Sequence, residues 1–421
     1  MPPFLTRGLP MRRLLLISLA FCSLLTIRAS AAHVLTQLAE LTPTDRFNQD
    51  WFGTSVAVDK DTVVVGDFDA NIEQYGAAYV YLKPASGWGD MTQVAKLTSS
   101  DNGEGFGTSV AVSGNVIVVG AANTSNFEPS ATPGAVYVFV KPVGGWKDMT
   151  ETAKLVASDG VAGDAFGNSV SISGGTVAVG AFFVNNFSGR VYVFTRIGAG
   201  WKQAAKLTAS DSSGLLDYLG CSVAVNGNTV VAGSFGHNNF QGAGYVFVEP
   251  ATGWANSTET AELSVSNGRG GDNLGFSVGI NGATIVAGAP GAANGFGSAY
   301  VYVQPTGGWR STSDFTAQLA ASDAIEGDSF GQAVGISDGG RVVIVGAPGQ
   351  TVGSNLEEGA AYVYVQPKSG WSTTRRSFSE LTASDGAAFD TMGVSVGLSG
   401  STFVAGAPKS NSPGEAYVFG P

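Results

Sequence analysis

The sequence predicts an all-β protein, a seven-bladed β-propeller with four antiparallel strands in each blade. Three observations predict this fold. A unit of about 55 residues recurs seven times, each unit contains four short segments with the pattern of β-strands, and the two ends of the chain carry complementary parts of one unit.

Composition narrows the class of protein before any repeat is considered. The chain has 421 residues, of which 44% are hydrophobic, and its 60 glycines follow no three-residue period, so wholesale disorder and collagen are excluded. Two cysteines are too few for a disulfide framework or a cysteine-rich zinc site. A net charge of −11 argues against a nucleic-acid partner, because phosphate binding requires clustered lysine and arginine.

Four kinds of residue mark the same points in successive units. A glycine opens the first strand, at Gly53, Gly107, Gly167, Gly220, Gly275, Gly331 and Gly393. A second glycine ends the next apolar segment, at Gly66, Gly120, Gly180, Gly233, Gly288, Gly346 and Gly406. A tyrosine lies in the third strand, at Tyr79, Tyr137, Tyr192, Tyr245, Tyr300, Tyr362 and Tyr417. A tryptophan follows each of the first six tyrosines, at Trp88, Trp146, Trp201, Trp254, Trp309 and Trp371.

Each unit contains four predicted strands. In the second unit the first strand alternates small and branched residues over 109–112, and we expect it to be buried on both faces, with little room on one, near the axis where blades converge. The second strand, 116–119, is continuously apolar, and the third, 135–140, is β-branched and aromatic. The fourth includes 153–155. Turns rich in Gly, Asn and Ser, such as 226–228, predict tight hairpins between the first two strands.

The chain ends predict that the ring is closed. The seventh unit stops after its third strand, at 417–419, whereas 39–42 match the fourth-strand pattern of 95–98. The N-terminal segment should therefore supply the outer strand of the last blade, which removes an open sheet edge. We predict one propeller domain over residues 32–421; an open solenoid is the alternative.

Residues 1–31 have the features of a secretory signal peptide. Arg12 and Arg13 precede an apolar run, 14–27, that is too short for a transmembrane helix, and a small-residue site follows near Ala31. Translation from Met11 would give a more compact signal. We expect a secreted protein, located extracellularly, in a periplasm or at the cell surface after cleavage near Ala31, without membrane insertion. Cleavage removes four arginines and no acid, which changes the net charge from −11 to −15.

Two landmarks of the units resemble those of FG-GAP repeat proteins. Phe106-Gly107 opens a unit, and Gly288-Ala289-Pro290 ends a second strand. The chain resembles the secreted FG-GAP repeat proteins of bacteria and the propeller of integrin α-subunits, which implies a role in extracellular binding or adhesion. Integrin-type repeats carry a calcium loop of the form D-x-D-x-D-G-x-x-D between the first two strands. Here that link is as short as 113–115, so we expect neither Ca²⁺ nor another cofactor or metal.

Repeated acids lie in the links from the fourth strand of one unit to the first strand of the next. One set comprises Asp50, Asp164, Asp217, Asp272, Asp328 and Asp390, with Glu104 at the same place in unit two. An earlier set comprises Asp45, Asp101, Asp159, Asp211, Asp323 and Asp385, with Asn267 in unit five. These links share one face of a propeller with the links between the second and third strands, whose lengths vary. We interpret this acidic, variable face as a docking surface; the alternative is that the aspartates accept backbone N–H bonds and hold identical turns.

Aromatic side chains give two further interpretations. The variable links carry Phe68, Phe127, Phe187, Phe240 and Phe296, which either contact a partner or cover the end of the propeller. The tryptophans pack between blade edges or, in a lectin-like protein, stack on sugar rings.

No catalytic set stands out from the sequence. Beyond the predicted signal the chain has two histidines, His33 and His237, and neither suggests a metal constellation or a Ser/His/Asp set. We predict a non-catalytic, monomeric binding or adhesion module that presents its acidic, variable face to an extracellular protein. A carbohydrate-binding propeller is the alternative, and a hydrolase or lyase that uses loop carboxylates is a third reading.

Overall fold

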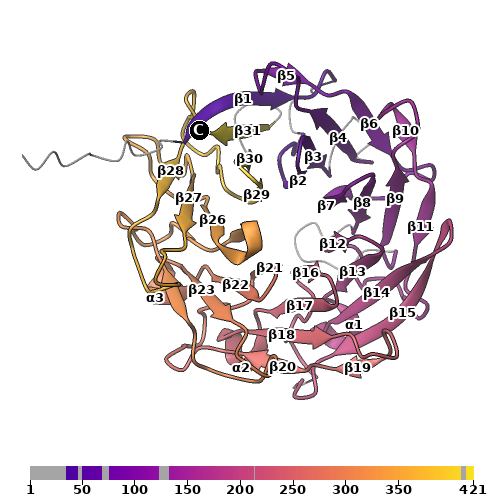
Figure 1. Ribbon diagram of the computed structural model, residues 1–421, viewed down its shortest axis with the longest axis vertical. Coiled ribbons are helices and arrows are strands. Elements are labelled where there is room, and N and C mark those ends of the chain that lie inside the picture. The colour runs from indigo at the N-terminus through magenta and orange to yellow at the C-terminus, as the bar shows by residue number, and fades with distance from the viewer. Residues whose placement is uncertain (1–34, 46–49, 69–74, 123–131, 213, 409–413) are drawn as a thin grey trace, which may run out of the picture. The chain divides into compact units, whose positions relative to one another are not determined.

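Seven antiparallel sheets surround one axis and form a β-propeller (Figure 1). The computed structural model describes residues 35–45, 50–68, 75–122, 132–212, 214–408 and 414–421, and residues Leu35–Pro421 form one unit. The predicted signal peptide and Phe127 lie outside the described residues. Among the described residues, no helix has both the length and the apolar character needed to cross a bilayer.

Each blade has four antiparallel strands, numbered here from the axis outward. The first strands are β2 (Ser55–Asp59), β7 (Phe106–Ser113), β12 (Val170–Ser173), β16 (Val223–Asn226), β21 (Ser277–Asn281), β25 (Ala333–Ser337) and β29 (Ser395–Ser399). The second strands are β3 (Thr62–Asp67), β8 (Val116–Ala121), β13 (Thr176–Ala181), β17 (Thr229–Ser234), β22 (Thr284–Ala289), β26 (Val342–Ala347) and β30 (Thr402–Ala407). The third strands are β4 (Ala77–Leu82), β9 (Ala135–Val140), β14 (Arg190–Ile197), β18 (Ala243–Val248), β23 (Ser298–Val303), β27 (Ala360–Val365) and β31 (Glu415–Gly420). The fourth strands are β6 (Ala95–Thr98), β11 (Ala153–Leu155), β15 (Gly200–Thr208), β20 (Ala261–Leu263), β24 (Ala317–Leu319), β28 (Ser379–Leu381) and, for the last blade, β1 (Thr36–Thr42).

The N-terminal strand closes the ring, as the sequence predicted. β1 pairs antiparallel with β31, with Glu40 opposite Tyr417 and Leu41 opposite Ala416. Along the axis the Ser395 hydroxyl of blade 7 donates to the Gly53 carbonyl of blade 1 at 2.7 Å. Blade 7 is therefore built from both ends of the described chain.

Most of the core of the described chain lies in seven interfaces between neighbouring blades, and an eighth, smaller cluster surrounds Phe182 and Phe183. Each of the seven interface clusters combines side chains of two consecutive blades, and the residue before each first-strand glycine is buried in one of them. Phe106, for example, packs edge-on against Tyr137 with ring centroids 5.4 Å apart. The Phe-Gly landmark thus supplies an aromatic contact that joins the start of the first strand to the third strand of the same blade.

Two of the first strands, β2 and β25, are more exposed than the sequence predicted, whereas β21 is buried from Ser277 to Ile280. Every residue of β2 is half-buried, and β25 is buried only at Ser337. The expectation of burial on both faces was wrong for β2 and β25, which lie innermost in their blades and line the axis of the ring (Figure 1). Their small side chains nevertheless fit positions where neighbouring blades converge.

The links between the first and second strands are tight hairpins. Six of the seven contain two residues, such as 114–115 between β7 and β8, and the seventh forms a short 3-10 turn at Asp338–Gly340. Hairpin tips also join neighbouring blades, since the Gly114 amide donates to Asp59 Oδ2 at 2.6 Å. The calcium loop of integrin-type repeats therefore has no counterpart at these described links.

The outer strands are covered by segments of the next blade. β5 (Met91–Thr92), β10 (Met149–Thr150) and β19 (Ser257–Thr258) run parallel to β1, β6 and β15, respectively. These two-residue strands pair with backbone that would otherwise form an exposed sheet edge. They add a second connection between blades at the rim of the ring.

Candidate functional site

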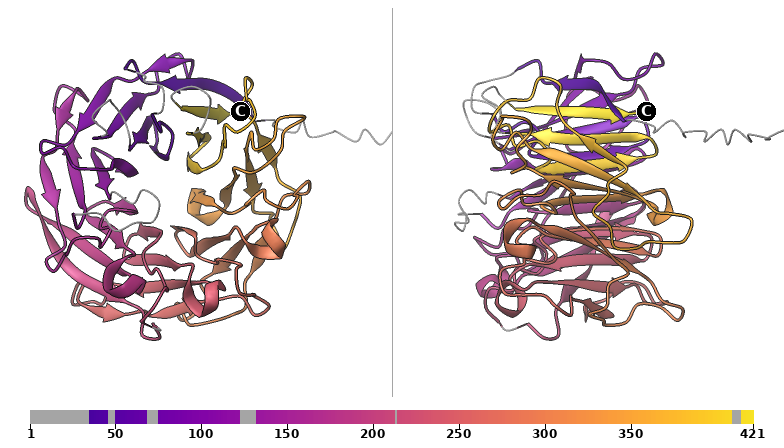
Figure 2. Two further views of the ribbon diagram at one scale, coloured as in Figure 1. Left: turned by 180° about the vertical axis from the view of Figure 1, so that it is seen from behind. Right: turned by 90° about the vertical axis from the view of Figure 1, so that its left-hand side faces the viewer.

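Among the described residues, two kinds of links form one face of the ring, which we call the variable face. It consists of the links between second and third strands and the links between consecutive blades. The two kinds of links adjoin, as the Tyr218 amide donates to the Phe187 carbonyl at 2.7 Å. In blades 3, 4 and 5 the links between second and third strands contain four-residue turns, α1 (Val184–Phe187), α2 (His237–Phe240) and α3 (Ala292–Gly295), whose two central residues have positive φ. Figure 2 shows the ring edge-on, with links emerging on both faces.

The aspartates nearest the first strands lie inside the turns of this face. Asp50, Asp164, Asp217, Asp328 and Asp390 are 5%, 4%, 2%, 1% and 4% exposed, and Asp272 is half-buried. Four of the carboxylates accept the backbone N–H three residues earlier, from Val161 to Asp164 at 2.8 Å, Arg269 to Asp272 at 2.7 Å, Ile325 to Asp328 at 2.6 Å, and Ala387 to Asp390 at 2.7 Å. Asp217 instead accepts the Ser212 hydroxyl at 2.6 Å. Burial raises the pKa of Asp164, Asp328 and Asp390.

These contacts favour the turn-holding interpretation for the individual aspartates. A carboxylate that is almost fully buried offers little surface to a partner, so the five buried aspartates support the turns of the face, whereas Glu104, at the same place in unit two, is exposed. Whether the face itself binds a partner stays a prediction.

The residues that these turns present to solvent differ from blade to blade. Val161, Arg269, Ile325 and Ala387 are all exposed, although their N–H groups are held by equivalent aspartates. A uniform backbone with changing tips is the arrangement found where loops on a rigid scaffold recognise a ligand.

Two of the predicted phenylalanines belong to an aromatic cluster on blades 3 and 4. Phe187 and Phe240 are half-buried, and their ring centroids lie 5.6 Å and 6.3 Å from that of Tyr218. Tyr218 stacks on Phe235 at 4.6 Å with an interplanar angle of 10°. Beside the cluster, Leu215 and Leu216 are exposed. This part of the variable face is therefore apolar, and its two phenylalanines both cover the cluster and reach the surface.

Phe296 lies elsewhere, in a pocket between blades 5 and 6. The pocket has a volume of about 340 Å³ and is lined by Phe296, Ser298, Gln318, Thr373, Thr374 and Arg375, among others. The Gln318 side-chain amide donates to the Ser298 hydroxyl at 2.9 Å, and Arg375 Nε donates to the Ala321 carbonyl at 3.2 Å. Phe296 lies beside Gln318 and Arg375 only in the folded protein, because these residues come from segments that are far apart in the sequence.

The tryptophan series packs in the core rather than on the surface. Trp146, Trp254, Trp309 and Trp371 are buried, and Trp88 and Trp201 are half-buried against neighbouring clusters. The Trp371 indole N–H donates to the Gly340 carbonyl at 3.0 Å. Packing, not stacking on sugar rings, accounts for this marker.

The second set of aspartates forms polar corners with the marker tyrosines. The tyrosine hydroxyl donates to the aspartate in blades 1, 2, 3, 4 and 6, at 3.0, 2.7, 3.1, 2.9 and 3.2 Å. In blades 1–3 a fourth-strand lysine completes the corner, pairing Lys96 with Asp45, Lys154 with Asp101, and Lys206 with Asp159. Burial opposes ionisation of Asp101 and Asp159, but hydrogen bonds from the lysine and the tyrosine outweigh it and lower the pKa of both carboxyl groups.

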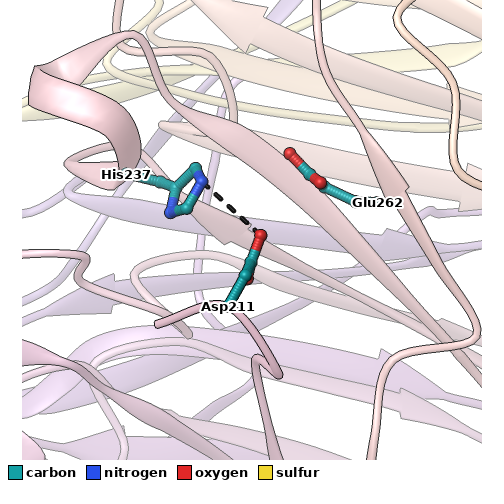
Figure 3. A group of neighbouring side chains, drawn as sticks. All are labelled: Asp211, His237 and Glu262. Carbon is teal, nitrogen blue, oxygen red and sulfur yellow. Dashed lines mark ion pairs between the residues drawn. The ribbon is translucent and has the colours of Figure 1, made fainter. Parts of the chain in front are cut away.

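The corner of blade 4 differs, because Glu262 stands where blades 1–3 have lysine. Asp211, His237 and Glu262 each place one potential metal-ligand atom within 4.8 Å of the others (Figure 3). His237 Nε2 lies 3.7 Å from Asp211 Oδ2. Burial, and next the charge of Asp211, raise the pKa of Glu262, while His237 lowers it.

This geometry brings His237 beside two carboxylates, which the sequence did not indicate, while the expectation that the chain holds no metal stays a prediction. The three residues are about 25 positions apart, so no local motif indicated them. Alignment of the repeats carried the signal, since the residue at this position changes from lysine in blades 1–3 (Lys96, Lys154 and Lys206) to Glu262 in blade 4.

Comparison with known families assigns the repeats. Seven segments match the FG-GAP repeat, at residues 35–81, 91–139, 149–194, 201–247, 257–302, 314–364 and 376–419. No curated protein matches the chain. Each matched segment combines the fourth strand of one blade with the first three strands of the next, so the sequence repeat spans two blades.

Proposed function

Because all seven repeats match the FG-GAP repeat, the chain belongs to the FG-GAP repeat family, and we propose that it is a non-catalytic binding or adhesion module of the cell exterior. In this proposal the variable face contacts a protein partner. Secretion after cleavage near Ala31 is part of the proposal. N-terminal sequencing of the protein recovered outside the cell tests that part.

One observation carries the proposal: exposed apolar side chains at the tips of the variable face. Val161, Leu215, Ile325 and Phe389 are 62%, 63%, 51% and 53% exposed, and all lie in links between blades. Apolar tips lose contact with water when a complementary protein surface covers them, which contributes about 25 cal/mol per Å² of buried area. Burial of these tips favours a protein partner over a polar ligand.

The acids contribute to the proposed interface indirectly. The buried aspartates hold the turn backbone that presents the tips, and their charge adds to the negative field of the chain. We therefore expect a partner with apolar contact residues and a basic rim, whose association slows as salt is raised.

The test compares a variable-face variant with a matched variant of the opposite face. Val161→Glu, Ile325→Glu and Phe389→Glu together should reduce capture of partner proteins from the native cell surface or matrix by about tenfold or more. Val94→Glu, Val143→Glu and Phe378→Glu change three exposed apolar residues in the links between third and fourth strands, and capture should be unchanged. Equal capture by both variants would place the interface elsewhere.

A second candidate function is carbohydrate binding at the pocket beside Phe296. An aromatic side chain next to Ser298, Gln318, Thr373 and Arg375 is the combination expected where a sugar ring stacks and its hydroxyl groups donate and accept hydrogen bonds. On a glycan array, this candidate would be favoured if Phe296→Ala abolished glycan binding and the variable-face variant still bound glycan. Binding of protein but not glycan would favour the first.

A further inference from the structure

One side-chain position in the outer strand separates the blades into two classes. The residue paired with the marker tyrosine is Lys96, Lys154 and Lys206 in blades 1–3, Glu262, Gln318 and Glu380 in blades 4–6, and Glu40 in blade 7. In the first class the lysine ammonium group lies against the aspartate that accepts the tyrosine hydroxyl. A cation is thus part of the corner in three of the blades.

Blade 4 keeps the aspartate and the tyrosine but lacks this cation. Tyr245 still donates to Asp211 at 2.9 Å, and Glu262 places a second carboxylate beside Asp211 in place of the ammonium group. His237 enters the same corner from α2, in the link between β17 and β18, and Figure 3 shows its ring directed toward Asp211. One imidazole and two carboxylates therefore meet where the other class has an ammonium group.

A third carboxylate lies behind the imidazole. The side chain of Asp217 is 3% exposed, and its Oδ1 lies 3.4 Å from His237 Nδ1, a buried nitrogen with no hydrogen-bond partner. Ser212 donates to the other oxygen of Asp217 at 2.6 Å. At metal sites an outer-shell carboxylate accepts a hydrogen bond from one nitrogen of the ligating histidine, and Asp217 lies close enough to Nδ1 to accept that bond after a small shift of the ring.

We propose that Asp211, His237 and Glu262 bind a divalent transition-metal ion, with Zn²⁺ as the ion that fits best. Zn²⁺ takes histidine nitrogen and carboxylate oxygen at about 2.0–2.2 Å, commonly with three protein ligands and a water. Ca²⁺ requires six to eight oxygen ligands and is disfavoured by an imidazole. The three potential ligand atoms already lie within 4.8 Å of one another, and Glu262 is half-buried beside the other two.

The ion would take the place of the lysine ammonium group. It balances two carboxylates that otherwise repel one another, and it ties α2 to the outer strand β20 through His237 and Glu262. Since Phe240 ends the same turn, binding would also fix one aromatic side chain of the variable face. The inference stands independently of the partner-binding proposal, because it requires only these side chains.

Titration of the tag-free mature protein, freed of metal by a chelator and then dialysed, tests the proposal. Isothermal calorimetry with Zn²⁺ should give one site with a dissociation constant of about 1 μM or tighter, and Co²⁺ should give the visible absorption of a tetrahedral complex. His237→Gln should weaken Zn²⁺ binding about 100-fold or more, and Asp217→Asn about 10–100-fold. No saturable binding would overturn the proposal.

The repeats supply a matched pair of variants for this test. Glu262→Lys restores the residue of blades 1–3, so it should fold normally and lose Zn²⁺ binding. Glu380→Lys makes the same change in blade 6, where Asp323 and Tyr362 form a corner without an imidazole, and Zn²⁺ binding should be unchanged. If a folded Glu262→Lys protein bound Zn²⁺ as tightly as the native protein, the ion would lie elsewhere and the assignment would be wrong.

Discussion

The two marker glycines of the repeat touch one another across the blade interface. A Cβ atom at Gly233, at the end of β17, would lie 1.7 Å from the carbonyl oxygen of Gly275 in the next blade. The equivalent distance at the other six interfaces is 1.9–2.2 Å. Gly275 itself has a φ of +82°, which L side chains rarely adopt. Both markers are therefore required by the close approach of two backbones.

We expect Gly233→Ala to destabilise the protein by about 1–3 kcal/mol or more, because backbone rather than a flexible side chain must move to admit the methyl group. Denaturant unfolding monitored by circular dichroism measures the change. Gly144→Ala is the control, since Gly144 is exposed, has no neighbour within 4 Å and does not have a positive φ. Equal midpoints for the two variants would contradict this account of the marker.

Elements of neighbouring blades are interlocked at both chain ends and at the rim. β1 supplies the outer strand of blade 7 and buries Ala39 and Leu41 in the interface with blade 1. β5, from blade 1, then pairs with the outer edge of β1. The N-terminal segment thus holds the first and last blades together, and it removes the edge that β31 would otherwise expose.

A circular permutant tests whether ring closure requires only the presence of β1 or also its position at the N-terminal end. A permutant that begins at Asp50 and carries residues 35–45 after Pro421, joined by a copy of the blade 6 link 366–378, should form the same ring. Its free energy of unfolding should fall by no more than about 2 kcal/mol, as only a connection changes.

Deletion of residues 35–45 provides the comparison. The loss of buried Leu41 alone should cost about 2–5 kcal/mol, and the exposed edge of β31 should cause association. Size-exclusion chromatography and urea unfolding distinguish the two proteins. A monomeric deletion variant with the native midpoint would show that β1 does not close the ring.

Over the whole molecule the charged corners are divided unevenly. Blades 1–3 carry lysine beside aspartate, whereas blades 4, 6 and 7 carry glutamate at the same position. Burial raises the pKa of Glu262, Asp328, Glu358, Glu380 and Asp390, while hydrogen bonds lower that of Asp101 and Asp159. The two groups should therefore respond to acid in opposite directions.

We predict that the metal-free protein is more stable near pH 5 than at pH 7. Acids with a raised folded pKa take up protons in the folded state before the unfolded chain does, so stability rises as the pH falls toward the unfolded values of about 3.9–4.3. The stability that Asp101 and Asp159 contribute is present above about pH 3.9 and is lost as the pH falls through their lowered folded pKa. Thermal unfolding across this range measures the profile.

Removal of two raised groups serves as the control for this profile. Asp328→Asn with Glu380→Gln should flatten the rise between pH 7 and pH 5 and leave the loss below pH 4 in place. A native protein that loses stability steadily from pH 7 downward would contradict the prediction.

Local sequence patterns predicted most of the fold. Alternation, apolar runs and turn residues indicated the strands of every blade, and the predicted strands 135–140 and 153–155 coincide with β9 and β11. The two-residue strands β5, β10 and β19 were not predicted, because two residues carry no periodicity. The exposure of the site residues could not be predicted either. An aspartate three residues before a glycine gives the same sequence pattern whether its side chain faces solvent or is buried and accepts a backbone N–H bond.

The sequence by itself determined the number of blades, the order of strands and the closure of the ring, because all three follow from the register of a repeat and from the incomplete unit at each end. Tertiary structure alone decided that five of the aspartates nearest the first strands are buried, that the tips beside them are exposed, and that Asp211, His237 and Glu262 meet. Those outcomes depend on how links from different strands converge over a blade, and spacing along the chain does not encode that convergence.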